Sequence, residues 1–155
     1  MAQRNIKVHG KKYPKIKSLM EDLAREELEH ADQCTQLLKE MNLECRFIPT
    51  NLYAKGLRDL AHNSGTGSFM DQLLVCSLIE ARSAERFRLL ADAANGTTLG
   101  NFYADLYASE VGHYVLFVKL SAEQFGTEPT LKRLEFLRKG EASLIRNLPH
   151  GPRIH

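Results

Sequence analysis

The sequence predicts an all-α protein, an antiparallel bundle of helices. Three long stretches repeat apolar residues at alternating steps of three and four, which is the period of one face of an α-helix. No stretch of useful length alternates in the way typical of a strand, and glycine, proline and asparagine separate the periodic stretches. The 155 residues are enough for one domain around a single core.

Composition and charge exclude several classes of protein. The chain has no run of eighteen apolar residues, which argues against a membrane span, and no apolar core of a signal peptide. Three cysteines in no zinc-like spacing predict a reducing, cytoplasmic compartment rather than a disulfide framework. The net charge of +2 says little about partners. Residues 1–17, however, hold six cationic side chains and no acid, and such a stretch is a candidate for contact with a polyanion such as RNA. We expect residues 1–13 to form a basic extended lead and residues 14–155 the helical domain.

The first long stretch predicts one helix from about Ile16 to Met41. Eight residues recur along a single face, which we call its seam: Ile16, Met20, Leu23, Glu27, His30, Cys34, Leu37 and Met41. Six of them are apolar or cysteine, so the two polar members, Glu27 and His30, are expected to face inward.

Four further helices follow in the prediction. A short helix covers Leu52 to His62, after which residues 62–67 form a loop and Ser68 opens the next helix as an N-cap. The second long helix spans about Phe69 to Ala94 and ends at Asn95-Gly96. The third spans Thr98 to Phe125 and ends at Gly126. The last helix follows Pro129, with apolar contacts from Leu131, Leu134, Leu137 and Leu144.

Two matched tetrads stand in the middle of these helices. Glu27-Leu28-Glu29-His30 and Glu110-Val111-Gly112-His113 both read Glu-x-x-His. Residues three apart share a helix face, so each tetrad presents a carboxylate and an imidazole together. Inward-facing Glu-x-x-His pairs from two helices, with single glutamates from two more, form the di-iron site of ferritin-like bundles. The pattern therefore predicts a ferritin-like antiparallel bundle.

The second long helix offers two acids as a further ligand, Glu80 and Glu85. Glu80 lies fifteen residues before Asn95 and Glu110 fifteen after it, so a short antiparallel connection places them at one level. Glu80 also lies in the seam of its helix. We therefore favour Glu80 as the metal ligand, and expect Glu85 to pair with Arg82 or Arg86.

A buried hydrogen-bond network of glutamate and histidine without metal is the alternative to a metal site. Buried carboxylates are costly unless they are compensated. A cation compensates them directly, and carboxylate with imidazole suits iron or manganese. We therefore favour the metal. Asp59 on the short helix is a weaker candidate for an additional ligand.

Three blocks together resemble the MiaE family of tRNA hydroxylases: residues 23–30, residues 79–87 and residues 102–114. Their order and spacing match over about residues 13–153, including the Pro-Arg-Ile-His ending. The resemblance implies a ferritin-like di-iron monooxygenase that uses dioxygen to hydroxylate the isopentenyl group of 2-methylthio-N6-isopentenyladenosine in tRNA. It implies five iron ligands, the same five that spacing selects: Glu27, His30, Glu80, Glu110 and His113.

The family also has an N-terminal helix with a sixth ligand, a glutamate in a Cys-Glu-Lys-Lys-like block, and no part of this sequence matches it. The sequence is then either a truncated reading frame or a natural short form with an incomplete site. A sixth ligand would have to come from upstream sequence or from a second subunit covering the exposed part of the seam. No flavin, haem or iron–sulfur motif is present, so the expected partners are tRNA and an external electron donor. The other hypotheses are a ferritin-like metal-binding protein or truncated form without catalysis, and a di-iron oxidase of another small molecule.

Overall fold

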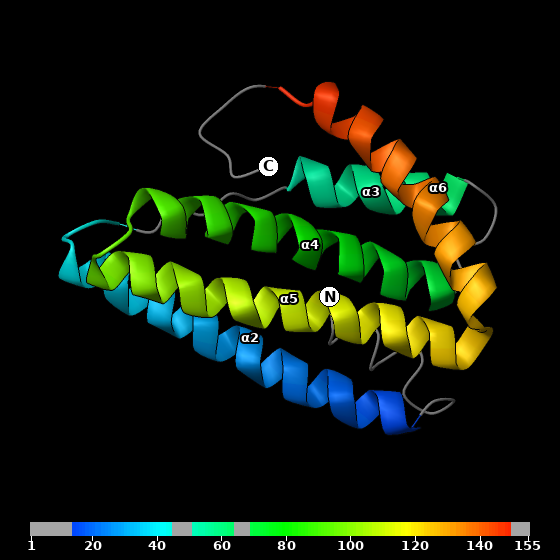
Figure 1. Cartoon of the computed structure of the whole chain (residues 1–155), viewed down its shortest axis with the longest axis horizontal. Coiled ribbons are helices and arrows are strands. Elements are labelled where there is room, and N and C mark those ends of the chain that lie inside the picture. Colours follow the sequence, from blue (N-terminus) through cyan, green and yellow to red (C-terminus); the bar gives the residue numbers. More distant parts are fainter. Residues whose placement is uncertain (1–13, 45–50, 64–68, 150–155) are drawn as a thin grey trace. The chain divides into compact units, whose positions relative to one another are not determined.

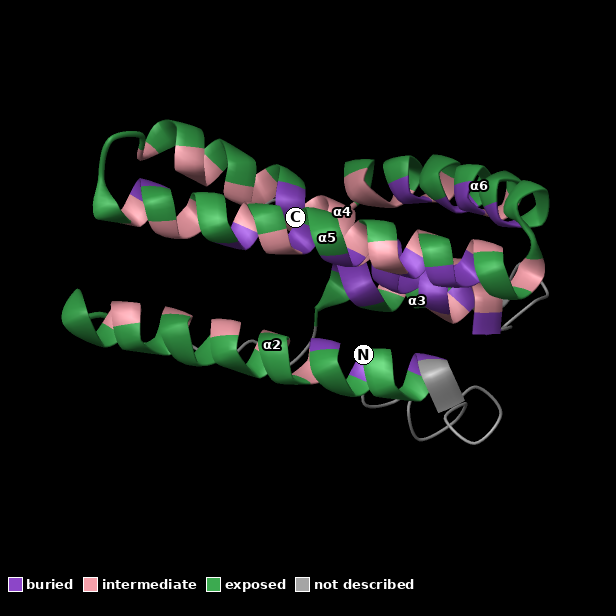
Figure 2. Ribbon diagram, turned by 60° about the horizontal axis from the view of Figure 1, so that its bottom comes forward, coloured by how far each residue is buried: buried purple, intermediate pink, exposed green. Residues whose placement is uncertain are grey.

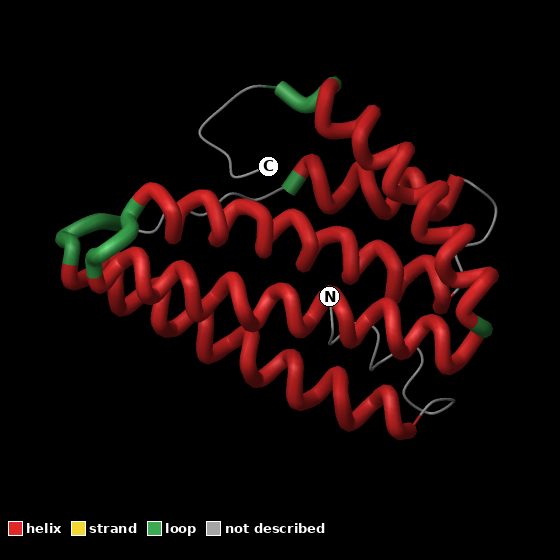
Figure 3. Tube along the Cα trace, in the orientation of Figure 1, coloured by secondary structure: helices red, strands yellow, loops and turns green. Residues whose placement is uncertain are grey.

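The computed structural model describes residues 14–44, 51–63 and 69–149, and over these ranges the protein consists of five α-helices. Figure 3 shows helices and short connections, with no strand in the part of the chain that is described. The all-α prediction is therefore confirmed. Residues 62 and 63, which were expected to begin a loop, are helical. The rest of that loop, residues 64–67, lies outside the described residues, as do the expected lead and the Ser68 cap. No helix among the described residues is both long and apolar enough to cross a membrane.

The chain divides into two compact units, Met1–Thr50 and Asn51–His155. The first unit contains α2 (Pro14–Glu40). This helix starts with proline, whose missing N–H costs nothing at a first position. It ends at Asn42, which has a φ of 55°, with hydrogen bonds from Leu43 N to Leu38 O and from Asn42 N to Lys39 O. That is a Schellman cap with asparagine in the position usually held by glycine.

Burial along α2 follows the predicted seam in its first half. Ile16, Met20 and Leu23 are buried, and Glu27 and His30 are partly buried. The expected seam residue Met41 lies just past the end of the helix and is 50% exposed. The periodicity therefore identified the buried face of the helix, and its last expected residue lies one residue past the helix end.

The second unit contains α3 (Leu52–Asn63), α4 (Phe69–Ala93), α5 (Thr98–Phe125) and α6 (Thr127–Arg146). Figure 1 shows α4 and α5 side by side and antiparallel. The contact between these two helices is the most extensive one between helices of this unit. Gly96, with φ of 78°, turns the chain between them. Thr97 then caps α5, because its hydroxyl accepts a hydrogen bond of 3.0 Å from Gly100 N.

The start of α6 differs from the prediction. We expected the helix to follow Pro129, but it begins at Thr127, so Pro129 is its third residue. The first four N–H groups of a helix have no partner within the helix, and a proline there loses no hydrogen bond. Leu131 was expected to make an apolar contact, yet it is 53% exposed. Leu134 and Leu137 are buried as expected.

The main core lies between α3, α4 and α6, where buried residues concentrate in Figure 2. The first half of α4 is buried on nearly all sides because α3, α5 and α6 all pack against it. The sequence predicted a single apolar seam for α4 and missed this second face. The core residues are Tyr53, Leu57, Ala61, Leu74, Val75, Leu78, Leu134 and Leu137.

Two polar networks tie these helices together. Asp71 of α4 is buried and forms an ion pair of 2.7 Å with Arg133 of α6, which removes Arg133 from the cations available to a partner. Glu141 of α6 accepts hydrogen bonds from the Tyr53 hydroxyl at 2.6 Å and from Arg82 at 3.3 Å. Burial and the Glu141 carboxylate raise the pKa of Tyr53 well above its usual range, so this phenol stays a donor.

Candidate metal centre

Three of the five predicted ligands converge within the second unit. Glu80 lies on α4, and Glu110 and His113 lie on α5. Each offers one ligand atom, and these atoms all lie within 4.8 Å of one another. The convergence follows from the short antiparallel connection at Asn95-Gly96, which sets Glu80 and Glu110 at one level.

The two α5 residues of this group are buried. Glu110 is 6% exposed and His113 is 5% exposed, and Glu80 is partly buried. They stand in line with Leu106, Phe117 and Leu120, all buried on the same face of α5. Burial of Glu110 and His113 on the apolar face of α5 costs free energy, because charged groups lose water when they are buried. A bound cation would offset this cost.

The His113 ring is oriented by its own helix. Its Nε2 lies 3.4 Å from the hydroxyl of Ser109, one turn earlier. Metal-binding histidines commonly use one ring nitrogen for the metal and the other for such a contact.

The donor set fits a transition metal. Two carboxylates and one imidazole are ligands that suit iron or manganese. Metal–ligand bonds of about 2.0–2.2 Å, as for first-row divalent ions, put opposite ligand atoms about 4 Å apart. A spread of 4.8 Å or less therefore closes around a cation with small side-chain movements.

Glu27 and His30 lie three residues apart on α2, in the first unit. Both are partly buried, and His30 Nε2 lies 3.9 Å from Glu26 Oε1 on the same helix. The helix thus presents a carboxylate and an imidazole on one face. Their part in a metal site stays a prediction.

The competing acids have other partners. Glu85 forms an ion pair with Arg82, as predicted. Asp59 is exposed and pairs with Lys55 on α3 at 2.6 Å. Burial alone would lower the pKa of Arg82, but the carboxylates of Glu141 and Glu85 outweigh it and raise that pKa. The pairing with Glu141, 59 residues away, had no signal in the sequence.

Four aromatic residues of α4 and α5 divide into two groups by their place relative to the converging ligands. Phe87 and Tyr103 stack with ring centroids 6.2 Å apart, each seven residues from Glu80 or Glu110. Phe117 is buried seven residues beyond Glu110. Tyr107 instead lines a separate pocket between α4, α5 and α6, to which none of the three converging ligands contributes.

Known proteins share this sequence and fold. The family model "tRNA-(MS[2]IO[6]A)-hydroxylase (MiaE)" matches residues 2–155. The tRNA 2-(methylsulfanyl)-N(6)-isopentenyladenosine(37) hydroxylase of Pseudomonas putida is 37% identical over 139 residues, which are 89% of this chain and 67% of that protein. The hydroxylase of the same name from Salmonella typhimurium is 32% identical over 133 residues, 86% of this chain and 48% of that protein. The chain thus spans between about half and two thirds of the length of these relatives.

A solved structure has a similar fold. "Protein 43 with aldehyde deformylating oxygenase activity from Synechococcus" superposes with a TM-score of 0.83 and 30% identity, covering 99% of this chain and 76% of that one. The predicted ferritin-like bundle is confirmed by this likeness. The family match extends over nearly every residue, including all three blocks on which the sequence resemblance rested, and it follows that the chain belongs to the MiaE family of tRNA hydroxylases.

Proposed function

We propose that this protein is an oxygen-dependent monooxygenase that hydroxylates the isopentenyl group of 2-methylthio-N6-isopentenyladenosine in tRNA. The observation that carries the proposal is the convergence of Glu80, Glu110 and His113 in a chain of this family. One oxygen atom of dioxygen enters a C–H bond of the prenyl group and the other leaves as water. The balance requires two electrons and two protons from an external donor.

The proposed ligands are Glu27, His30, Glu80, Glu110 and His113, holding two iron ions. Bound iron would supply the activation of dioxygen that organic side chains cannot perform. The chain's own residues fix the carboxylates and the imidazoles. Ser109 orients the His113 ring, and the helix packing of α4 against α5 holds Glu80 opposite Glu110.

The surroundings of the three converging residues favour a dry reaction space. Phe87 and Tyr103 stack on one side of them along the two helices, and Phe117 is buried on the other. Apolar walls exclude water, which would otherwise intercept reactive oxygen species. They also suit a five-carbon prenyl group, because burial of each CH₂ contributes about 0.8 kcal/mol.

The test is nucleoside analysis of tRNA after incubation of the iron-loaded protein with a reductant and isotopically labelled dioxygen. We expect hydroxylated prenyladenosine carrying one labelled oxygen atom. Glu110→Gln should abolish the product, because an amide is a poor iron ligand. Glu123→Gln is the matched control: Glu123 lies on the same helix, is exposed and pairs with Lys119, so its product yield should equal that of wild type. If iron is bound and the nucleosides do not change, the protein is a metal-binding member without this activity.

A further inference from the structure

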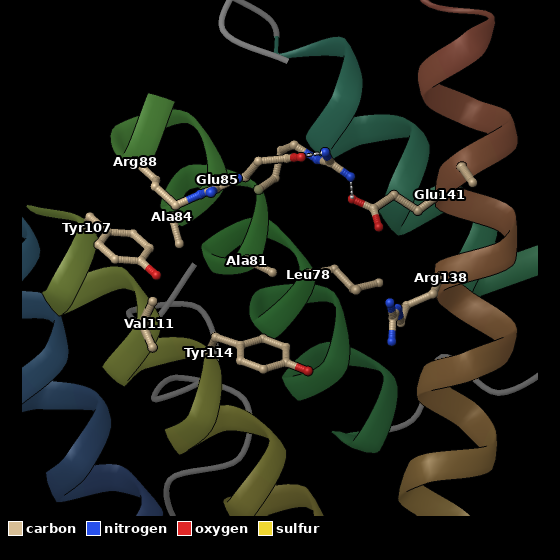
Figure 4. A pocket seen from close by; sticks show the side chains of 12 residues that line it. Leu78, Ala81, Ala84, Glu85, Arg88, Tyr107, Val111, Tyr114, Arg138 and Glu141 are labelled. Atoms are coloured by element: carbon tan, nitrogen blue, oxygen red, sulfur yellow. Dashed lines mark hydrogen bonds and ion pairs between the residues drawn. The ribbon is translucent and has the colours of Figure 1, made fainter. Parts of the chain in front are cut away.

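A cavity lies between α4, α5 and α6. It has a volume of about 540 Å³, within the range of small-molecule sites. Figure 4 shows side chains from all three helices around it. None of Glu80, Glu110 and His113 lines it, so it is a different site from the candidate metal centre.

The arginines that line this pocket outnumber the carboxylates that line it. Three arginines line it, Arg82, Arg88 and Arg138, against two glutamates, Glu85 and Glu141. Arg82 pairs with both glutamates, and Glu141 also accepts the Tyr53 hydroxyl. Within residues 14–44, 51–63 and 69–149, no carboxylate forms an ion pair with Arg88 or Arg138. Their positive charges therefore remain available to an anionic ligand.

Two tyrosines form another wall of the pocket. Tyr107 and Tyr114 lie seven residues apart on α5, with Val111 between them, and all three share one helix face. In Figure 4 the Tyr114 ring and the Arg138 guanidinium point into the space between α5 and α6. A tyrosine ring beside a guanidinium fork offers a stacking surface and a phosphate donor together.

We infer that this pocket binds one nucleotide of an RNA strand, with its phosphate on Arg138 and its base against Tyr114. Arg88, which lies at the other end of the pocket in Figure 4, would then contact a neighbouring phosphate of the same strand. The nucleotide is not the one that is hydroxylated, because the metal-ligand residues do not line the pocket. The inference rests on the proposed function in one respect, which is that RNA is the partner. It adds a second contact that would hold the tRNA while the modified adenosine reaches the iron.

The test measures binding of an unmodified anticodon stem-loop RNA to the full-length protein by fluorescence anisotropy across a range of salt. Removing one phosphate contact reduces the magnitude of the slope of log K against log salt by about 0.7–0.9. At 0.1 M salt, a change in slope of this size corresponds to about five- to eightfold weaker binding. We expect this loss for Arg138→Ala and for Arg88→Ala. Arg138→Lys should keep the slope, because it keeps the charge.

The controls separate the pocket from general charge and from folding. Lys132→Ala removes one positive charge from an exposed position on the same helix, outside the pocket, and should change binding less than Arg138→Ala. Tyr114→Leu should weaken binding at least about fivefold through lost stacking, whereas Tyr114→Phe should bind like wild type. Circular dichroism of each variant reports that the helices are intact.

Each outcome decides one claim. Equal binding and equal salt slopes for Arg138→Ala and wild type would overturn the pocket, while hydroxylation by the same variant would leave the proposed function standing. RNA binding that depends on Arg138 in a protein that makes no hydroxylated nucleoside would support the pocket and refute the function. Tight, Arg138-dependent binding of free adenosine monophosphate would overturn the assignment to an RNA strand.

Discussion

His113 has two ring nitrogens, and its environment distinguishes them. Nε2 lies 3.4 Å from Ser109 Oγ, a long contact for a hydrogen bond, which metal binding would shorten by fixing the ring. We therefore expect Nδ1 to bind the metal. We expect Ser109 to position the ring rather than to bind the metal.

Ser109→Ala should weaken iron binding about tenfold, the lower end of the effect seen when the outer partner of a metal ligand is lost. Anaerobic competition with a chromophoric chelator measures the affinity. Ser109→Thr keeps a hydroxyl at this position and should bind iron nearly as tightly as wild type. Unchanged affinity in the alanine variant would show that packing alone orients the ring.

At the scale of elements, the α4–α5 connection is the structural basis of the site. A Cβ added at Gly100 would lie 2.3 Å from the carbonyl oxygen of Ala94. That oxygen also accepts hydrogen bonds from Thr97 N at 3.2 Å and Thr97 Oγ1 at 2.6 Å. It is backbone, already held in the turn, so it has little freedom to move away. Glycine at this position allows the end of α4 and the start of α5 to lie in close contact.

Two glycine substitutions on α5 should have opposite effects. Gly100→Ala should lower the free energy of unfolding by about 1–3 kcal/mol, because it forces a backbone shift in the turn. Gly112→Ala meets no atom within 4 Å and should raise it by about 0.5–1 kcal/mol through helix propensity. Urea unfolding followed by circular dichroism measures both. Equal stabilities for the two variants would contradict this account of the turn.

At the scale of the whole molecule, the features that could be predicted from the sequence are those that depend on residues close together in the chain. Asn42, Gly96 and Gly126 mark chain turns by themselves, so the helix ends near them were placed within one or two residues. The relation of Glu80 to Glu110 was also predictable, because a short connection fixes the register of two antiparallel helices. Pro129 misled the prediction, since proline is a breaker inside a helix and harmless in its first turn.

The parts that were missed depend on how α6 and α3 pack. Periodicity identifies one buried face, and it cannot report that the first half of α4 touches three helices at once. The ion pairs of Glu141 with Arg82 and of Asp71 with Arg133 join residues about sixty positions apart. No spacing rule connects them, and the arginine pocket is formed by the same packing.

The last prediction concerns α2, because the second unit alone offers three ligands for a site that would hold two irons. If Glu27 and His30 are ligands, Glu27→Gln and His30→Ala should each lower the iron content from about two per chain to one or fewer. Binding that favours the folded state also stabilises it, by about 2.7 kcal/mol at one hundred times Kd. The increase in melting temperature on adding ferrous iron without oxygen should therefore shrink in both variants. Glu29→Gln, an exposed neighbour on α2, is the matched control and should keep the iron and the full increase. Wild-type iron content in Glu27→Gln and His30→Ala would mean that α2 does not contribute to the metal centre, whatever its resemblance to the second tetrad.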